Sequence, residues 1–157
     1  MSKRTKHKAS NSSSDPATVN RKIILTAQFC LIIAASIAGY LLWYSVTQKP
    51  MAGCGPGSSC DRVMGSSWAY WFSIPVSAPA LLAYLTLLCG IEIVRGRQTS
   101  PDLTARGWKI ILFAGTAVLA SAIWFTSIQI CVLNSLCKFC TSAHLLGSLG
   151  VLLLLSQ

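Results

Sequence analysis

The sequence predicts an all-α fold, a bundle of four transmembrane helices, from three observations. Hydrophobic residues make up 53% of the 157-residue chain and charged residues 11%, which is unusual for a soluble globular protein. About 20 apolar residues in a helix cross a hydrocarbon core of about 30 Å, and four charge-free stretches are long enough: residues 23–44, 63–91, 110–137 and 139–157. These stretches lack the alternation of membrane-barrel strands, so helices are expected to satisfy the backbone groups inside the bilayer.

The basic residues predict the orientation of the bundle. Thirteen Lys and Arg residues contribute to a formal net charge of +9, and ten of them precede the first span or separate the second from the third: Lys3, Arg4, Lys6, Lys8, Arg21, Lys22, Arg95, Arg97, Arg106 and Lys109. Only Lys49, Arg62 and Lys138 lie in the other two connections. By the positive-inside bias, the N-terminus, the connection 95–109 and the C-terminus are expected in the cytoplasm. Topology therefore accounts for the basic surplus, and no nucleic-acid partner is expected.

The N-terminal residues 1–20 are predicted to be a disordered cytoplasmic tail, because they are rich in Ser, Lys and Asn and have little to bury. The apolar run that follows, residues 23–44, exceeds the roughly 7–15 residues of a signal-peptide core, and no small-x-small cleavage site precedes a polar mature domain. We expect this run to be retained as the first span. Residues 21–157 are then one membrane domain.

The connection at residues 45–58 is predicted to be a mobile loop on the outside, because Gly and Pro are frequent in it. At its end, Ser58 is followed three residues later by Asp61, a pattern typical of a helix N-cap. A short interfacial helix is therefore expected after this loop, with Cys60 in its first turn.

Two prolines, Pro75 and Pro79, interrupt the second apolar stretch. They predict a break near residues 73–74 and a second span that runs to about Val94. Aromatic rings favour the headgroup layer, and four lie where this stretch enters the bilayer: Trp68, Tyr70, Trp71 and Phe72. An interfacial belt accounts for most of them, and one or two can also line a ligand pocket.

Four of the seven cysteines are predicted to lie at or near the outside face: Cys54, Cys60, Cys137 and Cys140. Disulfides form outside the cytosol and are rare within it. The spacing Cys137-x-x-Cys140 is used in thiol–disulfide exchange, and its place at a helix N-terminus beside Lys138 favours a thiolate. One helical turn separates the two sulfurs, so Cys137 should face the loop and Cys140 the bundle interior.

The Gly-rich loop between Cys54 and Cys60 can bring Cys60 near Cys137 and then re-pair it with Cys54 through mixed disulfides. The residues alone leave two alternatives open, a pair of purely structural disulfides or a zinc site made by Cys137, Cys140 and His144. A site so close to the apolar interior suits electron exchange better than a structural link, so redox chemistry is favoured and no metal is expected.

The remaining three cysteines are not assigned to this chemistry. Cys30 in the first span and Cys89 in the second are predicted to be small, buried apolar residues. Cys131, near the outer end of the third span, can be either a buried residue or part of an accessory disulfide.

The order of these features resembles the vitamin K epoxide reductase family over residues 21–157. The resemblance rests on the loop cysteine pair, on Cys60-Asp61-Arg62-Val63 with Ser66 and Trp68, on Ile74-Pro75, and on Cys137-x-x-Cys140 at the start of the last span. A Cys-x-x-Cys motif alone is common, but four spans with both pairs on one side, in this order, are specific. Pro79-Ala80 departs from the larger apolar residue and glycine of the family pattern, so helix shape and ring contacts are expected to differ there.

The resemblance implies a four-helix bundle around the head group of a quinone of the ubiquinone, menaquinone or phylloquinone type. Cys140 would be the thiol next to the quinone, and Cys137 would be its exchange partner. Cys60 would shuttle electrons to Cys137, and Cys54 would meet the external reductant.

Two further residues are implied as quinone contacts. Ser66 matches a serine near the quinone in the family, where its hydroxyl can hydrogen-bond a carbonyl; an ordinary helix-surface serine is the alternative. His144, four residues after Cys140, matches a position near the ring, where it can supply a proton; a packed interhelical histidine is the alternative.

The implied function is a membrane thiol–disulfide oxidoreductase that oxidises an extracytoplasmic thioredoxin-fold protein, reduces quinone and so supports disulfide formation. Many bacterial relatives carry a fused thioredoxin-like domain after the last span, whereas this chain ends at Gln157, so the partner is expected to act in trans. The expected location is the bacterial cell membrane, with the active site on the extracytoplasmic side.

Two other functions are weighed against this one. Vitamin K epoxide or quinone reduction can be the main activity, as in animal members, but the short Cys54–Cys60 spacing resembles the microbial branch. A small transporter or non-catalytic membrane scaffold with structural disulfides is the other; Glu92, beside Arg95, is the only acidic residue that touches a span, so an ion pathway has little support.

Overall fold

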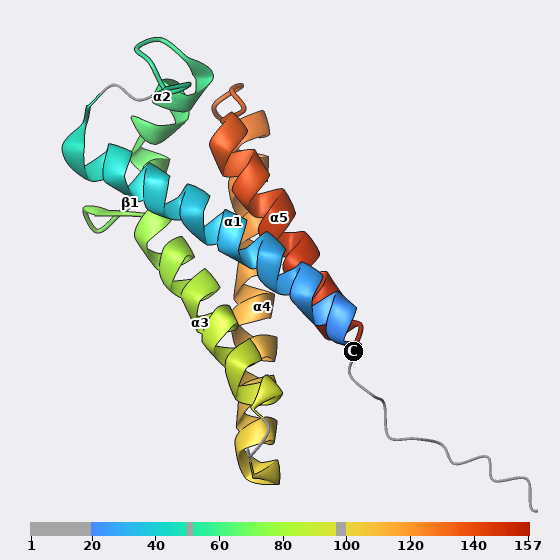
Figure 1. Cartoon of the computed structure of the whole chain (residues 1–157). Coiled ribbons are helices and arrows are strands. Elements are labelled where there is room, and N and C mark those ends of the chain that lie inside the picture. Colours follow the sequence, from blue (N-terminus) through green and yellow to red (C-terminus); the bar gives the residue numbers. More distant parts are fainter. Residues whose placement is uncertain (1–19, 50–51, 97–99) are drawn as a thin grey trace, which may run out of the picture.

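The computed structural model describes residues 20–49, 52–96 and 100–157, so residues 1–19 of the predicted tail lie outside the described residues. Within the described chain, four helices are long and apolar enough to cross a membrane: α1 (Arg21–Thr47), α3 (Ser77–Arg95), α4 (Pro101–Cys131) and α5 (Lys138–Leu155). They form a bundle in which α1 packs mainly on α5 and α3 mainly on α4 (Figure 1). The predicted four-helix fold is confirmed, and the chain is a multi-pass membrane protein.

The helix ends follow local capping chemistry rather than the limits of the charge-free stretches. The Asn20 side chain accepts an N–H of the first turn of α1 at 3.1 Å. Ser100 caps α4 with Pro101 in the first position, so this helix begins well before residues 110–137. At the same end of the bundle, the Asn20 N–H donates to Gln157 Oε1 at 2.8 Å, which places the C-terminus beside the start of α1 (Figure 1).

Residues 132–137 form a loop and not the last turns of the third span as predicted. The loop folds back on α4, because the Ser135 N–H donates to Gln129 O at 3.0 Å and the Cys137 N–H donates to Gln129 Oε1 at 2.8 Å. Asn134 adopts a left-handed backbone with φ of 44°, a conformation that asparagine tolerates. These bonds end α4 early and deliver Cys137 to the start of α5.

Small residues let the long helices approach one another closely. A Cβ atom on Gly150 of α5 would lie 2.9 Å from Leu31 Cγ and 3.2 Å from Ala27 O, both on α1. A Cβ atom on Gly107 of α4 would lie 3.4 Å from Gly90 O on α3. Inside a bilayer, helices associate largely through such van der Waals contact, and small residues at the interface permit it.

The predicted interfacial helix is α2 (Ser59–Met64), which lies over one end of the bundle (Figure 1). It begins as expected, with Ser58 Oγ accepting the Asp61 N–H at 3.1 Å and Cys60 in the first turn. A short 3₁₀ helix, η1 (Ser67–Ala69), follows it.

The chain then makes a small hairpin that was not predicted. Strands β1 (Tyr70–Trp71) and β2 (Ile74–Pro75) pair antiparallel through a turn at Phe72 and Ser73, whose φ angles are 50° and 66°. Hairpin turns with positive φ usually contain Gly or Asn, and neither occurs here, so the local sequence did not predict this turn. The hairpin replaces the simple break expected there, and α3 starts directly after it at Ser77.

Large apolar side chains are exposed along all four long helices, as expected of lipid-facing residues; among them are Phe29, Leu82, Phe113, Ile123 and Leu145. Cys30 is buried as predicted, whereas the expectation for Cys89 was wrong, because it is exposed on α3. A thiol is apolar enough to face lipid. Cys131, the last residue of α4, is an exposed free thiol.

The acidic residue at the edge of the second span is paired. Glu92 lies 3.6 Å from Arg95 on α3 and accepts from Gln28 Nε2 of α1 at 2.8 Å. Arg95 in turn donates to Gln28 Oε1 at 2.7 Å. This network links the two helices near the end of α3, in agreement with an interfacial position for Glu92.

Candidate functional site

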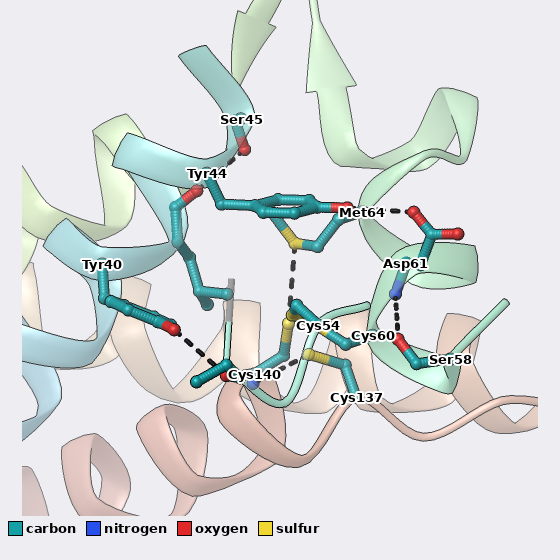
Figure 2. Close-up of a disulfide and its surroundings, with 12 residues drawn as sticks. Tyr40, Tyr44, Ser45, Cys54, Ser58, Cys60, Asp61, Met64, Cys137 and Cys140 are labelled. Carbon is teal, nitrogen blue, oxygen red and sulfur yellow. Dashed lines mark hydrogen bonds between the residues drawn. A yellow bond between two sulfur atoms is a disulfide. The ribbon is translucent and has the colours of Figure 1, made fainter. Parts of the chain in front are cut away.

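The four cysteines singled out from the sequence meet at one end of the bundle (Figure 2). Cys54 and Cys60 form a disulfide with Cα atoms 5.1 Å apart, and Cys137 and Cys140 are free thiols. One apolar cluster buries Cys54, Cys60 and Cys137, and Cys140 packs against this cluster. The other buried members of the cluster are Leu41, Tyr44, Val63 and Met64. A disulfide and a dithiol thus share one water-poor pocket of the fold.

The loop of the disulfide is held by Asp61. One carboxylate oxygen accepts from the Tyr44 hydroxyl and the other from the Gly57 N–H, each at 2.9 Å (Figure 2 draws the Tyr44 contact). The hydrogen bond from Gly57, followed by that from Tyr44, lowers the pKa of Asp61. The carboxylate therefore joins α1, the loop and α2 at neutral pH.

A second set of contacts places the loop over the start of α5. Tyr40 donates from its hydroxyl to Ala52 O at 3.1 Å, and its ring lies 5.3 Å from that of Phe139. Gly53 has a φ of 82°, and a Cβ atom there would lie 3.0 Å from Phe139 Cε2. Glycine is required at this position both for the backbone conformation and for the close approach.

Cys137 is the N-cap of α5 and is fully buried. Its sulfur accepts the Cys140 N–H at 3.2 Å. The hydrogen bond from the Cys140 thiol is the main cause that lowers the pKa of Cys137; the N–H groups of Cys140 and Phe139 assist it, and burial opposes it. A thiolate at this position was expected, but hydrogen bonds of the first helical turn favour it and not Lys138, whose side chain is exposed.

Below this cluster lies a cavity of about 240 Å³, bounded by residues of all four long helices, α2, η1 and the hairpin. Cys140 is part of its wall, and Cys140 Sγ lies 3.9 Å from Met64 Sδ (Figure 2). Cys137 is not in the wall. The two thiols are therefore ordered as predicted, with Cys137 beside the disulfide and Cys140 beside the cavity.

Most of the cavity wall is apolar, and its polar side chains come from different segments. Apart from the tyrosine and the tryptophans, the wall residues with a side-chain oxygen or nitrogen atom are Ser66, Ser77, Ser121, Gln129 and His144. Tyr84 also borders the cavity, but its hydroxyl donates to Ala143 O at 3.0 Å. An apolar wall with a few separated polar groups suits a largely hydrophobic ligand that carries a small polar head.

Both residues expected to contact a quinone lie in this wall. Ser66 Oγ donates to Val63 O at 2.7 Å, and Ser66 precedes η1 rather than lying on the surface of a helix. The His144 ring stacks on that of Phe125, with centroids 6.2 Å apart and planes within 6°. Their placement agrees with the expectation, and their roles remain predictions.

Two aromatic wall residues were expected from the sequence, whereas two polar ones, Gln129 and Ser77, were missed. Trp68 and Trp71 border the cavity, in agreement with the expectation that some interfacial aromatics line a pocket. Gln129 was not noticed, although a glutamine within an apolar run is a signal for an internal site. Ser77 has no comparable signal, because serine is common at the start of helices.

The zinc alternative has no support in the described chain. No group of three or more His, Cys, Asp or Glu side chains in residues 20–49, 52–96 and 100–157 is placed to hold a metal ion. Cys137, Cys140 and His144 therefore do not form the site that their spacing allowed.

Comparison with known proteins agrees with these observations. Residues 23–155 match the family model described as the vitamin K epoxide reductase family, and this range contains the bundle except for the first two residues of α1, together with both cysteine pairs and the cavity. The chain belongs to the vitamin K epoxide reductase family.

Proposed function

We propose that this protein is a membrane thiol–disulfide oxidoreductase that oxidises an extracytoplasmic thioredoxin-fold protein and transfers the electrons to a membrane quinone. Family membership and the four membrane helices support a membrane redox function in general. The position of Cys140 carries the more specific proposal, because its N–H donates to Cys137 Sγ at 3.2 Å and the residue borders the apolar cavity. One dithiol thereby links the Cys54–Cys60 disulfide to a site for a hydrophobic acceptor.

The proposed reaction begins at the outer pair. A thiolate of the reduced partner attacks the Cys54–Cys60 disulfide, and a second partner thiol resolves the mixed disulfide, so the partner becomes oxidised and the outer pair reduced. Cys60 then attacks a Cys137–Cys140 disulfide, and Cys54 resolves the product. The outer disulfide is regenerated, and the inner pair becomes a dithiol. The arrangement in Figure 2, with the outer pair joined and the inner pair as thiols, corresponds to this stage.

Oxidation of the inner dithiol releases two electrons and two protons, which a quinone accepts to become a quinol. The cavity fits this acceptor, because the wall is mostly apolar and includes Cys140 together with a few polar side chains. In the proposal, the Ser66 hydroxyl turns from Val63 O to donate to a carbonyl oxygen of the quinone, and His144 supplies a proton to the ring oxygen. The alanine-rich part of the wall, which includes Ala38, Ala80 and Ala83, would accept the hydrophobic tail.

The partner is proposed to act in trans, from the side on which α2 lies. The described basic residues favour the opposite end of the bundle, which has Arg21, Lys22, Arg95, Arg106 and Lys109, over the end with α2, which has Lys49, Arg62 and Lys138. This bias supports an extracytoplasmic position for both cysteine pairs in a bacterial cell membrane.

The decisive experiment follows quinone reduction by the purified full-length protein in nanodiscs, with a reduced thioredoxin as donor and a soluble quinone as acceptor. We expect Cys140→Ala and Cys54→Ala to fall to the uncatalysed rate. Cys89→Ala is the matched control, because Cys89 is exposed on α3 away from the cluster, and it should retain full activity. Undiminished turnover in Cys140→Ala would overturn the proposal.

The donor distinguishes the proposed function from its alternatives. Replacement of thioredoxin by dithiothreitol should bypass Cys54, so Cys54→Ala recovers activity with the small dithiol while Cys140→Ala does not. If wild type turns over with dithiothreitol but not with any thioredoxin-fold donor, quinone reduction is favoured as the main activity. Absence of turnover with every donor would favour a scaffold.

Thiol labelling of intact cells tests the orientation. An impermeant maleimide should label Cys131 directly, because that thiol is free and exposed at the outer end of α4, and should label Cys54 only after reduction. Labelling of either residue only after the cytosolic face is opened would reverse the proposed topology.

A further inference from the structure

We propose that the Ser77 hydroxyl hydrogen-bonds a carbonyl oxygen of the quinone and so helps to position its head group in the cavity. The inference deepens the proposed function and rests on it. It assigns a ligand contact to α3, a helix to which the sequence attached no functional residue.

The observation that carries it is a buried hydroxyl without a partner. Ser77 is the first residue of α3, is 5% exposed and borders the cavity. Its Oγ forms no hydrogen bond within the described residues. Folded proteins satisfy nearly all buried polar groups, because an unpaired hydroxyl has lost its hydrogen bonds to water and gained none in return. A ligand in the cavity that Ser77 borders would supply such a partner.

A second buried hydroxyl of the described chain, that of Thr141, provides a comparison for Ser77. Among the described residues, two buried side-chain oxygens lack a hydrogen-bond partner, Ser77 Oγ and Thr141 Oγ1. Ser77 borders the cavity and Thr141 does not. Thr141 therefore shares the burial and the missing partner but not the access to a ligand, which makes it a matched control.

The surroundings of Ser77 favour an oxygen acceptor. No side chain caps the N-terminus of α3, since its N-cap is Val76, and the first turn contains no acidic residue. The N-terminal end of a helix carries partial positive charge, which favours an electron-rich oxygen nearby. Ser77, at the first position, adds a rotatable hydroxyl to this end.

A hydroxyl also suits both redox states of the ligand. It donates to the carbonyl oxygen of a quinone and accepts from the hydroxyl of a quinol. Ser77 can therefore hold the same ring oxygen before and after reduction. Ser66 and His144 approach the cavity from other segments, so Ser77 is an additional contact and not a substitute for either.

The test is an equilibrium binding measurement on the full-length protein in nanodiscs with Cys140→Ala as background, which blocks turnover. Quenching of tryptophan fluorescence reports the ligand, since Trp68 and Trp71 border the cavity. The probes are 2-methyl-1,4-naphthoquinone and 2-methylnaphthalene, which differ in the two carbonyl groups. We expect Ser77→Ala to raise the Kd of the quinone about fivefold, the usual effect of losing one hydrogen bond, and to leave the Kd of the hydrocarbon unchanged.

Three further variants complete the design. Thr141→Val should bind both probes as the background protein does. Ser77→Thr keeps the hydroxyl and should retain the preference for the quinone, which also covers the case that Ser77→Ala does not fold. In the active protein, Ser77→Ala should raise KM for the quinone with little change in the rate of thiol–disulfide exchange with the donor.

Either of two results overturns the inference. One is an unchanged quinone Kd in Ser77→Ala, and the other is equal weakening of both probes, which would indicate packing rather than a hydrogen bond. If wild type binds and reduces the quinone while Ser77→Ala is unaffected, only the role of Ser77 falls. If wild type neither binds nor reduces it, the proposed function fails as well.

Discussion

Arg62 Nη1 donates to Ser135 Oγ at 3.1 Å and joins the two segments that must exchange electrons in the proposed reaction. Arg62 lies on α2, two residues after Cys60, and Ser135 lies in the loop that leads to Cys137. Ser135 is itself fixed by its N–H, which donates to Gln129 O at 3.0 Å. Helix α2, which contains Cys60, is therefore attached to the loop before Cys137 by two side chains that take no part in thiol exchange.

We predict that Arg62→Ala slows electron transfer from the Cys54–Cys60 pair to the Cys137–Cys140 pair several-fold, because α2 loses this hydrogen bond. A hydrogen bond from a charged donor contributes about 1.5–3 kcal/mol where it is shielded from water, and less where it is partly exposed, as here. KM for the quinone should not change. Rapid acid quenching, alkylation and mass spectrometry of the two pairs give the transfer rate. Arg106→Ala is the control, since Arg106 pairs with Asp102 at 2.9 Å at the remote end of α4. An unchanged rate in Arg62→Ala would refute the anchoring role.

Acidification should loosen the disulfide loop through Asp61. The pKa of this carboxyl is lowered in the folded protein, first by the Gly57 N–H and then by the Tyr44 hydroxyl. Its contribution to loop stability is therefore fully present above the pKa of an unfolded aspartate and is lost as the pH falls through the lowered value. The protection factor of the Gly57 amide in hydrogen exchange should drop in that acidic range. Asp61→Asn should be less protected at neutral pH and lose the acid-dependent step; a step of unaltered size in this variant would contradict the prediction.

The reactivity of Cys137 should depend on its neighbour in the first turn of α5. Because the Cys140 thiol is the main cause that lowers the pKa of Cys137, Cys140→Ala should move the pH profile of Cys137 alkylation to higher pH. Cys140→Ser keeps a hydrogen-bond donor and should move it less. Mass spectrometry after short exposure to iodoacetamide measures the profile. Identical profiles in the three proteins would show that Cys140 does not stabilise the thiolate.

Close packing of α1 on α5 should make Gly150 intolerant of a larger side chain. Gly150→Ala places a methyl group 2.9 Å from Leu31 Cγ, and overpacking of this kind costs about 1–3 kcal/mol of unfolding free energy. Gly39→Ala is the control, since a Cβ atom there has no neighbour within 4 Å and alanine favours the helix by up to about 1 kcal/mol. Thermal unfolding in detergent should rank Gly150→Ala below wild type and Gly39→Ala at or above it. The reverse order would mean that the two helices can separate without loss.

The bundle was predictable because the bilayer constrains the sequence directly. A span must be apolar over a fixed length, and this requirement is visible in residues 23–44 without any knowledge of the fold. Apart from the exposure of Cys89, the errors lie where the chain leaves the membrane. Gln129 ends α4 early by accepting the N–H groups of Ser135 and Cys137, and contacts of this kind are not encoded in hydropathy.

In the candidate site, too, some residues were predictable from the sequence and others were not. Residue type and spacing were sufficient to select Cys137 and Cys140 and to order them along one helical turn, because thiol exchange requires those residues. Ser77 could not be selected in this way, since serine is common at helix starts and this one becomes notable only because it borders a cavity. Gln129 lies within an apolar run, a signal that marks an internal polar residue but not its role.

Hydropathy, charge bias and cysteine spacing thus establish, without coordinates, that the chain crosses a membrane four times and has two separate cysteine pairs. Each of these properties is local, because it depends on residues that are close in the chain. The burial of the disulfide against Cys137, the Arg62–Ser135 anchor and the cavity beside Cys140 depend on packing between segments far apart in sequence. Such contacts form only when the helices meet, so they follow from the folded arrangement and not from any single stretch of residues.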